Sequence, residues 1–198
     1  MTHWPKQPVL SGRHVTLRPL LRSDADALLL ALSAGFERTF AGGLPTPGTI
    51  AAWLDKAEEE AAIGRAQVFA VLDADGVVSG TTRYMRMNAP ARRVEIGTTL
   101  YAPRVRRTGL NTEAKKLLLG HAFDVMGVHC VQIRTDALNQ RSRRAIERLG
   151  AKQDGILRGH NVMYDPDYGE RRRDTVVYSI LDIEWPGIRR HLDALLDR

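Results

Sequence analysis

Apolar and polar residues alternate at the start of the chain and then change to a helical spacing. The segment 13–20 (RHVTLRPL) alternates, which predicts a strand. The segment 23–32 (SDADALLLAL) begins with capping residues and continues with a leucine-rich run, which predicts a helix. A second helix is expected over 49–63, and the glycines and prolines between the two helices indicate a loop.

The middle of the chain predicts three successive strands. Segments 67–73 and 77–85 flank the sequence ADG, so we expect a hairpin. Segment 92–101 (RRVEIGTTLY) alternates again, and a regular strand has two faces. One face would carry Val94, Ile96, Thr98 and Leu100, and the other Arg93, Glu95, Gly97, Thr99 and Tyr101.

The remaining pattern alternates between helices and strands. We expect a helix that ends near 126, a strand over 129–136, a helix over 139–149, strands near 153–161 and 173–182, and a last helix from Trp185. This order predicts a mixed α/β sheet in one domain that spans 1–198. At 198 residues and 43% apolar content, the chain suits one domain with a substantial core.

The formal net charge of +6 indicates an anionic partner, which is a nucleic acid, an acidic membrane or a small molecule with phosphates. The excess is nearly all arginine, which forms forked contacts with phosphate better than lysine does. No lysine-rich tail is present, which disfavours nucleic-acid or membrane attachment by a tail. The arginine content fits codon bias equally well.

Several classes of protein are excluded or disfavoured. The single cysteine, Cys130, rules out an internal disulfide and is expected to be a buried structural thiol. No CxxC or HxxxH spacing indicates a metal site, so we expect none. The N-terminal sequence lacks a basic segment followed by an apolar core, and no apolar run approaches the roughly 18 residues of a membrane span. We therefore expect a cytoplasmic protein.

The stretch RRTGLNTEAKKLL, residues 106–118, directly follows the strand that ends at Tyr101 and opens a helix. The first N–H groups of a helix lack partners within it, and together with the macrodipole they form an anion site. Gly109 would let the backbone approach a ligand closely, and nearby arginines add positive charge. An ordinary helix start, capped by Asn111 or Thr112 and flanked by solvated arginines, explains the same residues.

The segment ALNQRSRRAIERLGAK, residues 137–152, predicts a helix with one buried side. Ser142, Ala145, Ile146 and Leu149 recur at helical spacing, and Asn139 stands at the cap position. On these residues alone, Asn139 is an ordinary helix cap and Ser142 a small polar residue in the first turn.

Taken together, these segments resemble the GNAT superfamily of acetyl-CoA-dependent N-acetyltransferases over roughly residues 10 to 185. Within it they resemble the branch of ribosomal-protein N-terminal acetyltransferases (RimJ/RimL-like). The acetyl-CoA signature Arg/Gln-x-x-Gly-x-Gly/Ala aligns with residues 106–111. The sequences TEA (112–114), NQRSRRAIERLGA (139–151), DGILR (154–158) and GERRRDTVVYSILDIEW (169–185) are typical of that branch. The resemblance implies a mixed, mostly antiparallel sheet flanked by helices.

This sequence departs from the family pattern at two positions. Asn111 replaces the last glycine of the signature, so its side chain either turns away from the pyrophosphate or bonds it. Ile146 stands where many relatives carry a tyrosine that is thought to protonate the leaving thiolate. The general acid must therefore come from another group.

The resemblance implies direct attack by an amine on the thioester of acetyl-CoA. The amine is mostly protonated at neutral pH, so a base must take its proton, directly or through water. Glu95 is the candidate base, because a partly desolvated carboxylate gains proton affinity. A surface carboxylate paired with an arginine is the alternative for Glu95. Ser142 is the candidate donor to the departing sulfur, with water as its substitute.

The resemblance also implies which residues contact acetyl-CoA. Gly97 permits distortion of the strand that ends at Tyr101, whose splayed end offers backbone N–H groups to the thioester oxygen. Asn139 would contact the pantetheine arm. The full set of expected cofactor contacts is Leu100, Tyr101, Arg104, Arg106, Arg107, Thr108, Gly109, Leu110, Asn111, Thr112, Asn139 and Ser142.

The sequence leaves the acetyl acceptor open among protein N-termini, amino acids, polyamines and antibiotics. In the family, loops that correspond to 34–48 and 160–172 set specificity. The second contains acidic Asp165, Asp167 and Glu170, which suit a cationic amine, and arginines, which suit an acidic one. We expect a monomer or a homodimer.

Two other functions stay open. A basic RNA- or ribosome-binding module would explain the arginines, but aromatic residues make up only 6% and no usual RNA-binding signature is present. A protein that binds acyl-CoA without catalysis is compatible with Asn111 and with the missing tyrosine.

Overall fold

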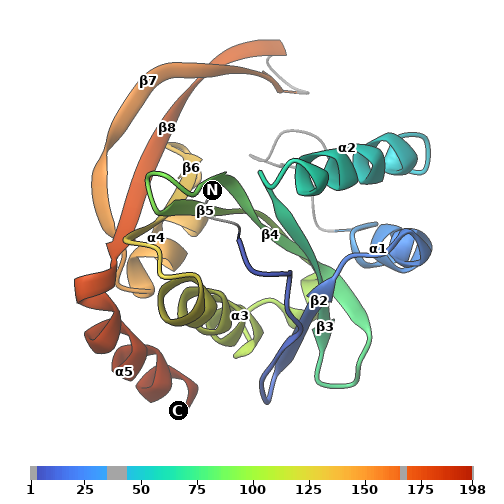
Figure 1. Ribbon diagram of the computed structural model, residues 1–198. Coiled ribbons are helices and arrows are strands. Elements are labelled where there is room, and N and C mark those ends of the chain that lie inside the picture. The colour runs from blue at the N-terminus through green and yellow to red at the C-terminus, as the bar shows by residue number, and fades with distance from the viewer. Residues whose placement is uncertain (1–3, 35–43, 166–168, 198) are drawn as a thin grey trace.

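The computed structural model describes residues 4–34, 44–165 and 169–197 (Figure 1). Within these ranges, eight strands form one sheet in the order β1-β2-β3-β4-β5-β6-β8-β7. Neighbouring strands are antiparallel except β5 and β6, which are parallel. The predicted mixed, mostly antiparallel α/β fold is confirmed. The strands are β1 (Leu10–Ser11), β2 (Val15–Pro19), β3 (Gln67–Asp73), β4 (Val78–Asn88), β5 (Arg93–Tyr101), β6 (Cys130–Asp136), β7 (Lys152–Asp165) and β8 (Gly169–Leu181).

Helices cover both faces of this sheet (Figure 1). They are α1 (Ala25–Ala31), α2 (Ile50–Ala62), α3 (Leu110–Gly120), α4 (Gln140–Arg148) and α5 (Trp185–Leu196), and a π-helical turn, His121–Val125, extends α3. Buried side chains of α3, α4 and α5 share the larger core with one face of the sheet. The smaller core lies on the other face, where α1 and α2 meet Leu100 of β5. The predicted helices match these elements closely because their apolar spacing is strong.

The predicted two-faced alternation of β5 is wrong beyond Gly97. Thr98 has a φ of 45°, and the register with β4 shifts at this point, which marks a β-bulge. One extra residue reverses the alternation, so Leu100 packs with α1 and α2 while Tyr101 packs against the larger core. Thr99 and Tyr101 therefore do not share a face with Glu95. A side chain at Gly97 would collide with Met85, which explains the glycine beside the bulge.

The predicted loop at 160–172 is wrong, because β7 continues to Asp165 and β8 starts at Gly169. Since β6 pairs with β8 only from Thr175 onward, these outer parts form a two-stranded ribbon that arches away from the sheet (Figure 1). Val162 and Tyr164 on the ribbon are exposed, so burial imposes no readable alternation there. Of the other predicted specificity loop, 34–48, residues 35–43 lie outside the described residues.

No helix within the described ranges is long and apolar enough to cross a membrane.

Candidate active site

The strands β5 and β6 separate soon after they meet. Their parallel pairing joins Arg93 to Cys130, Val94 to Val131 and Glu95 to Gln132. Beyond Glu95, β5 keeps its pairing with β4, whereas β6 pairs with β8 on its other side. Within the part of the chain that the structure describes, the backbone of β5 from Ile96 to Leu100 therefore has no strand partner on the β6 side.

The helix α3 begins directly after this unpaired stretch. Its first N–H group, that of Leu110, donates to Thr108 Oγ1 at 3.2 Å. Among the described residues, the N–H groups of Gly109, Asn111 and Thr112 have no acceptor. Unsatisfied donors at the positive end of the helix dipole form an anion site. The structure therefore places unpaired N–H donors at the position where the sequence predicts an anion site.

Three predicted arginines near this helix start have different surroundings. Arg104 pairs with Asp73 on β3 and donates to Ser79 Oγ at 2.7 Å. Arg106 donates from Nε to the carbonyl oxygen of Tyr101 at 3.0 Å, which holds the turn against the end of β5. Arg107 is exposed, with a φ of 65°. Arg104 can thus reach a ligand only by leaving Asp73.

Gly109 is in contact with His14, a residue that sequence reasoning missed. Its φ of −63° is ordinary helical backbone, so the conformation does not require glycine. A Cβ at this position would instead lie 2.9 Å from His14 Cδ2. The guanidinium of Arg13 in turn lies 3.1 Å from His14 Nε2. Two further basic side chains therefore lie near the start of α3, and no local pattern announces them because β2 and α3 are far apart in sequence.

Glu113 explains how β2 is held at this position. Its carboxylate accepts hydrogen bonds from the backbone N–H groups of Arg13, at 2.9 Å, and His14, at 2.5 Å. The side chain is buried, and Gly12 leaves the space that it occupies. Glu113 thereby fixes the turn before β2 against the first turn of α3.

The helix α4 is capped at its start and contacts the start of α3 from its end. Asn139 Oδ1 accepts from the backbone N–H of Ser142 at 3.0 Å, which confirms the predicted helix cap. Arg148, at the end of α4, donates to Thr112 Oγ1 at 2.7 Å. Ile146 is buried in the larger core. The structure thus brings the two predicted cofactor helices together.

Glu95 is buried and ion-paired. Arg86 Nη1 lies 2.8 Å from both carboxylate oxygens, and Arg134 Nε lies 3.1 Å from Oε2. Only 4% of the residue is exposed. The expected pairing with arginine is therefore present, but Glu95 is not a surface carboxylate as that alternative supposed, because its side chain is buried.

Two further polar groups lie inside the larger core near the bulge. Lys115 is 5% exposed, and burial lowers the pKa of its ammonium group to about 7. The hydroxyl of Tyr101 is buried with no hydrogen-bond partner among the described residues, and this burial raises the pKa of Tyr101 above its usual value. A buried hydroxyl without a partner costs free energy, so Tyr101 is a polar group that the core accommodates at a cost.

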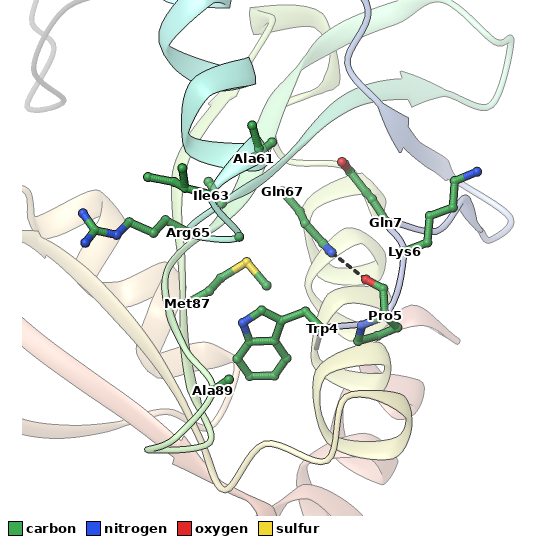
Figure 2. Close-up of a pocket in the computed structure, with 13 residues that line it drawn as sticks. Trp4, Pro5, Lys6, Gln7, Ala61, Ile63, Arg65, Gln67, Met87 and Ala89 are labelled. Atoms are coloured by element: carbon green, nitrogen blue, oxygen red, sulfur yellow. Dashed lines mark hydrogen bonds between the residues drawn. The ribbon is translucent and has the colours of Figure 1, made fainter. Parts of the chain in front are cut away.

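A cavity of about 640 Å³ lies apart from these residues, between the N-terminal segment and the end of α2 (Figure 2). Trp4, Met87 and Ala89 form part of its wall, and Gln67 Nε2 donates to the carbonyl oxygen of Pro5 at 3.0 Å across it. The predicted site residues do not line this cavity. Among the described residues, no group of three His, Cys, Asp or Glu side chains is placed to hold a metal ion.

Known proteins share this architecture. The family model described as acetyltransferase (GNAT) domain matches residues 14–152. A GCN5-related N-acetyltransferase from Brucella melitensis is 33% identical, with a TM-score of 0.85 over 98% of this chain and 87% of that one. A T. thermophilus structure described as an acetyltransferase is 33% identical, with a TM-score of 0.82 over 98% of this chain and 100% of that one. Mycobacterium smegmatis RimJ, solved with CoA-disulfide, is 22% identical, with a TM-score of 0.78 over 96% of this chain and 93% of that one. No curated protein sequence is detectably similar to the chain.

Proposed function

The chain belongs to the acetyltransferase (GNAT) family, and from this premise we propose that it transfers the acetyl group of acetyl-CoA to a primary amine. The observation that carries the proposal is the separation of β5 from β6 beside the start of α3. The separated strand offers free backbone groups to a thioester and pantetheine arm, and the helix start offers N–H donors to a pyrophosphate.

The cofactor contacts follow from this arrangement. We assign the pyrophosphate to the N–H groups of residues 109–112, with Thr108, Arg106 and Arg107 beside them. The thioester oxygen is assigned to the backbone at Leu100 and Tyr101, and the pantetheine arm to the side-chain amide of Asn139. Arg104 takes part only where a phosphate displaces Asp73 from it. Leu110 is buried, so its contribution is limited to the backbone.

The chemistry consists of two proton transfers around one nucleophilic attack. The neutral amine attacks the carbonyl carbon of the thioester, and the tetrahedral intermediate expels the CoA thiolate. Glu95 accepts the proton lost by the amine, directly or through a water molecule. Ser142, or water in its place, supplies a proton to the thiolate, since Ile146 has none to give.

We also propose that the chain belongs to the ribosomal-protein N-terminal acetyltransferase branch and acts in the cytoplasm. The sequences TEA (112–114) and GERRRDTVVYSILDIEW (169–185) support the branch. Glu113 of the first sequence holds the turn before β2 against α3, so its part here is structural. The acceptor of this branch would be the α-amino group of a protein.

The experiment that tests the proposed function measures thiol release from acetyl-CoA with a panel of peptides, amino acids, polyamines and aminoglycosides. We expect acceptor-dependent release and a matching acetylated amine by mass spectrometry. Calorimetry with CoA accompanies the assay. CoA binding without transfer to any amine would instead support a non-catalytic acyl-CoA-binding protein, and salt-sensitive RNA binding without CoA binding would support an RNA-binding module.

A further inference from the structure

Buried charges gather on the sheet face that also carries α1 and α2. Glu95 of β5 is paired with two arginines, and Asp136 of β6, only 1% exposed, forms a second such group. Arg171 contacts Asp136, and Arg173 Nε lies 3.7 Å from the same carboxylate. We call the four arginines the arginine cluster: Arg86, Arg134, Arg171 and Arg173.

The ion pairs around Glu95 and those around Asp136 interact electrostatically. Burial lowers the pKa of Arg173, and the charges of Asp136, Arg171, Glu95 and Arg86 all act on that pKa as well. A residue of β8 therefore lies within electrostatic reach of the ion pair between β4 and β5. Among the described residues, the ion pairs of this partly desolvated region join four guanidinium groups to two carboxylates.

The arginine cluster also has hydrogen-bonding capacity to spare. Arg173 Nε is buried and makes no hydrogen bond within the described residues. At the other side of the cluster, the side chain of Arg86 is 52% exposed, so a ligand can reach it from solvent. The unpaired Nε–H of Arg173 and the solvent-accessible guanidinium of Arg86 favour binding of an anion that approaches through Arg86.

We propose that the arginine cluster binds a carboxylate of the acetyl acceptor, so that the acceptors of this enzyme are amines that also carry an acidic group. The inference rests on the proposed function, because it places the amine beside Glu95. When the acceptor carboxylate pairs with Arg86, it replaces Glu95 on that guanidinium. Glu95 Oε1 is then open to a hydrogen bond from the amine, while Oε2 stays next to Arg134.

The same charges disfavour a cationic acceptor. A polyamine would bring several positive charges close to the four guanidinium groups of the arginine cluster, and like charges repel most where solvent screening is weak. The acidic side chain of Glu170 is exposed on the ribbon, and Arg171 and Arg173 on the same strand contact Asp136. Of the two acceptor charges that the sequence leaves open, the structure therefore favours the acidic one.

Matched acceptors test this inference. Peptides that begin Ser-Asp or Ser-Glu are compared with otherwise identical peptides that begin Ser-Asn or Ser-Gln, and spermidine is the cationic reference. Loss of a charge-assisted hydrogen bond lowers kcat/KM about ten- to hundredfold, so we expect that preference for the acidic peptides. Equal use of acidic and amide peptides, or a preference for spermidine, would overturn the inference.

Substitutions in the arginine cluster test whether these arginines cause the preference for acidic peptides. Arg86→Gln and Arg173→Gln are each expected to reduce the ratio of kcat/KM between acidic and amide peptides about tenfold. Arg172→Gln is the matched control, because Arg172 is exposed on the adjacent ribbon position and is expected to keep the wild-type ratio. Unchanged ratios in both cluster variants would overturn the assignment to these arginines. Circular dichroism and thermal unfolding establish that each variant is folded.

Binding measurements separate this inference from the proposed function. Calorimetry of the CoA-bound protein with the acidic and amide peptides needs no turnover. Tighter binding of the acidic peptides without any acetyl transfer would support the carboxylate subsite and contradict the proposed enzyme activity. Equal binding of both peptides, with or without transfer, would contradict the subsite.

Discussion

Lys115 Nζ lies 2.7 Å from Thr99 Oγ1, inside the core where α3 covers the bulge of β5. The same nitrogen lies 3.4 Å from Thr82 Oγ1 on β4, and the two threonine hydroxyls are 2.8 Å apart. A buried lysine with only hydroxyl partners loses hydration without gaining an ion pair. This explains why its pKa falls to about 7.

The first prediction is a pH-dependent stability that originates at Lys115. The unfolded chain has a lysine pKa of about 10.4, against about 7 in the folded protein. Between these values the unfolded state binds more protons, so the free energy of unfolding rises with pH in this window and is level below it. Lys115→Met removes the charge, so it should raise stability at pH 7 by roughly 1 kcal/mol or more and flatten the rise.

Urea unfolding at pH 6, 7, 8.5 and 9.5 measures this effect. Lys116→Met is the matched control, because Lys116 is only half-buried and pairs with Asp193. The control should retain the rise in stability above pH 7. A Lys115→Met protein that is less stable than the wild type by the same amount at every pH would show that the hydrogen bonds outweigh the cost of the buried charge.

The sequence predicts most elements of this fold because strands and helices with one buried side have clear periodicity. The bulge at Thr98 could not be predicted. The sequence TTLY (98–101) continues the alternation of the strand, whereas the backbone inserts one extra residue opposite β4. The outer part of the ribbon of β7 and β8 escapes prediction because its partly buried face carries arginines, not apolar residues, and Val162 and Tyr164 are exposed. The contact of Gly109 with His14 depends on tertiary structure that no local pattern encodes.

The second prediction separates two reasons for glycine at position 109. Gly109→Ala should destabilise the fold by about 1–3 kcal/mol, because its Cβ would crowd His14. The double variant with His14→Ala removes that crowding. If a pyrophosphate also needs the close backbone approach, the double variant should lose most of the CoA-dependent rise in Tm, whereas His14→Ala alone should keep it. Equal CoA-dependent shifts in these two proteins would mean that Gly109 serves packing alone.

The third prediction concerns Glu95 as the base. Glu95→Gln should lower turnover about a hundredfold or more at neutral pH, with nearly unchanged affinity for CoA. Because Glu95 also pairs with Arg86 and Arg134, the variant should be less stable as well, so activity is measured well below its Tm. The pH profile tests the role of base. If Glu95 is the base, the fall in rate at low pH that its protonation causes in the wild type should be absent from Glu95→Gln. A variant with the wild-type rate and profile would assign the proton transfer to water or to another group.

The fourth prediction separates the cap of α4 from the contact with the cofactor. Asn139→Ala should cost about 1 kcal/mol of stability through loss of the bond to the Ser142 N–H, and it should also weaken acetyl-CoA binding. Asn139→Asp keeps an oxygen acceptor for the cap but removes the amide donors. Asn139→Asp should therefore keep the stability of the wild type, but its affinity for acetyl-CoA should be reduced as in Asn139→Ala. Calorimetry measures that affinity. Full affinity in the Asp variant would limit Asn139 to capping.

The fifth prediction concerns Ser142, which lies in the first turn of α4 beside its cap. Its hydroxyl would matter only as negative charge develops on the departing sulfur, so Ser142→Ala should lower kcat with little change in cofactor affinity. Asn139 is proposed to contact the cofactor in both ground and transition states, so Asn139→Ala should change the affinity for acetyl-CoA and Ser142→Ala should change kcat. Buried Ile146, in the following turn, cannot donate a proton. Steady-state kinetics with one acceptor decides the matter, and a Ser142→Ala enzyme at full turnover would assign protonation of the thiolate to water.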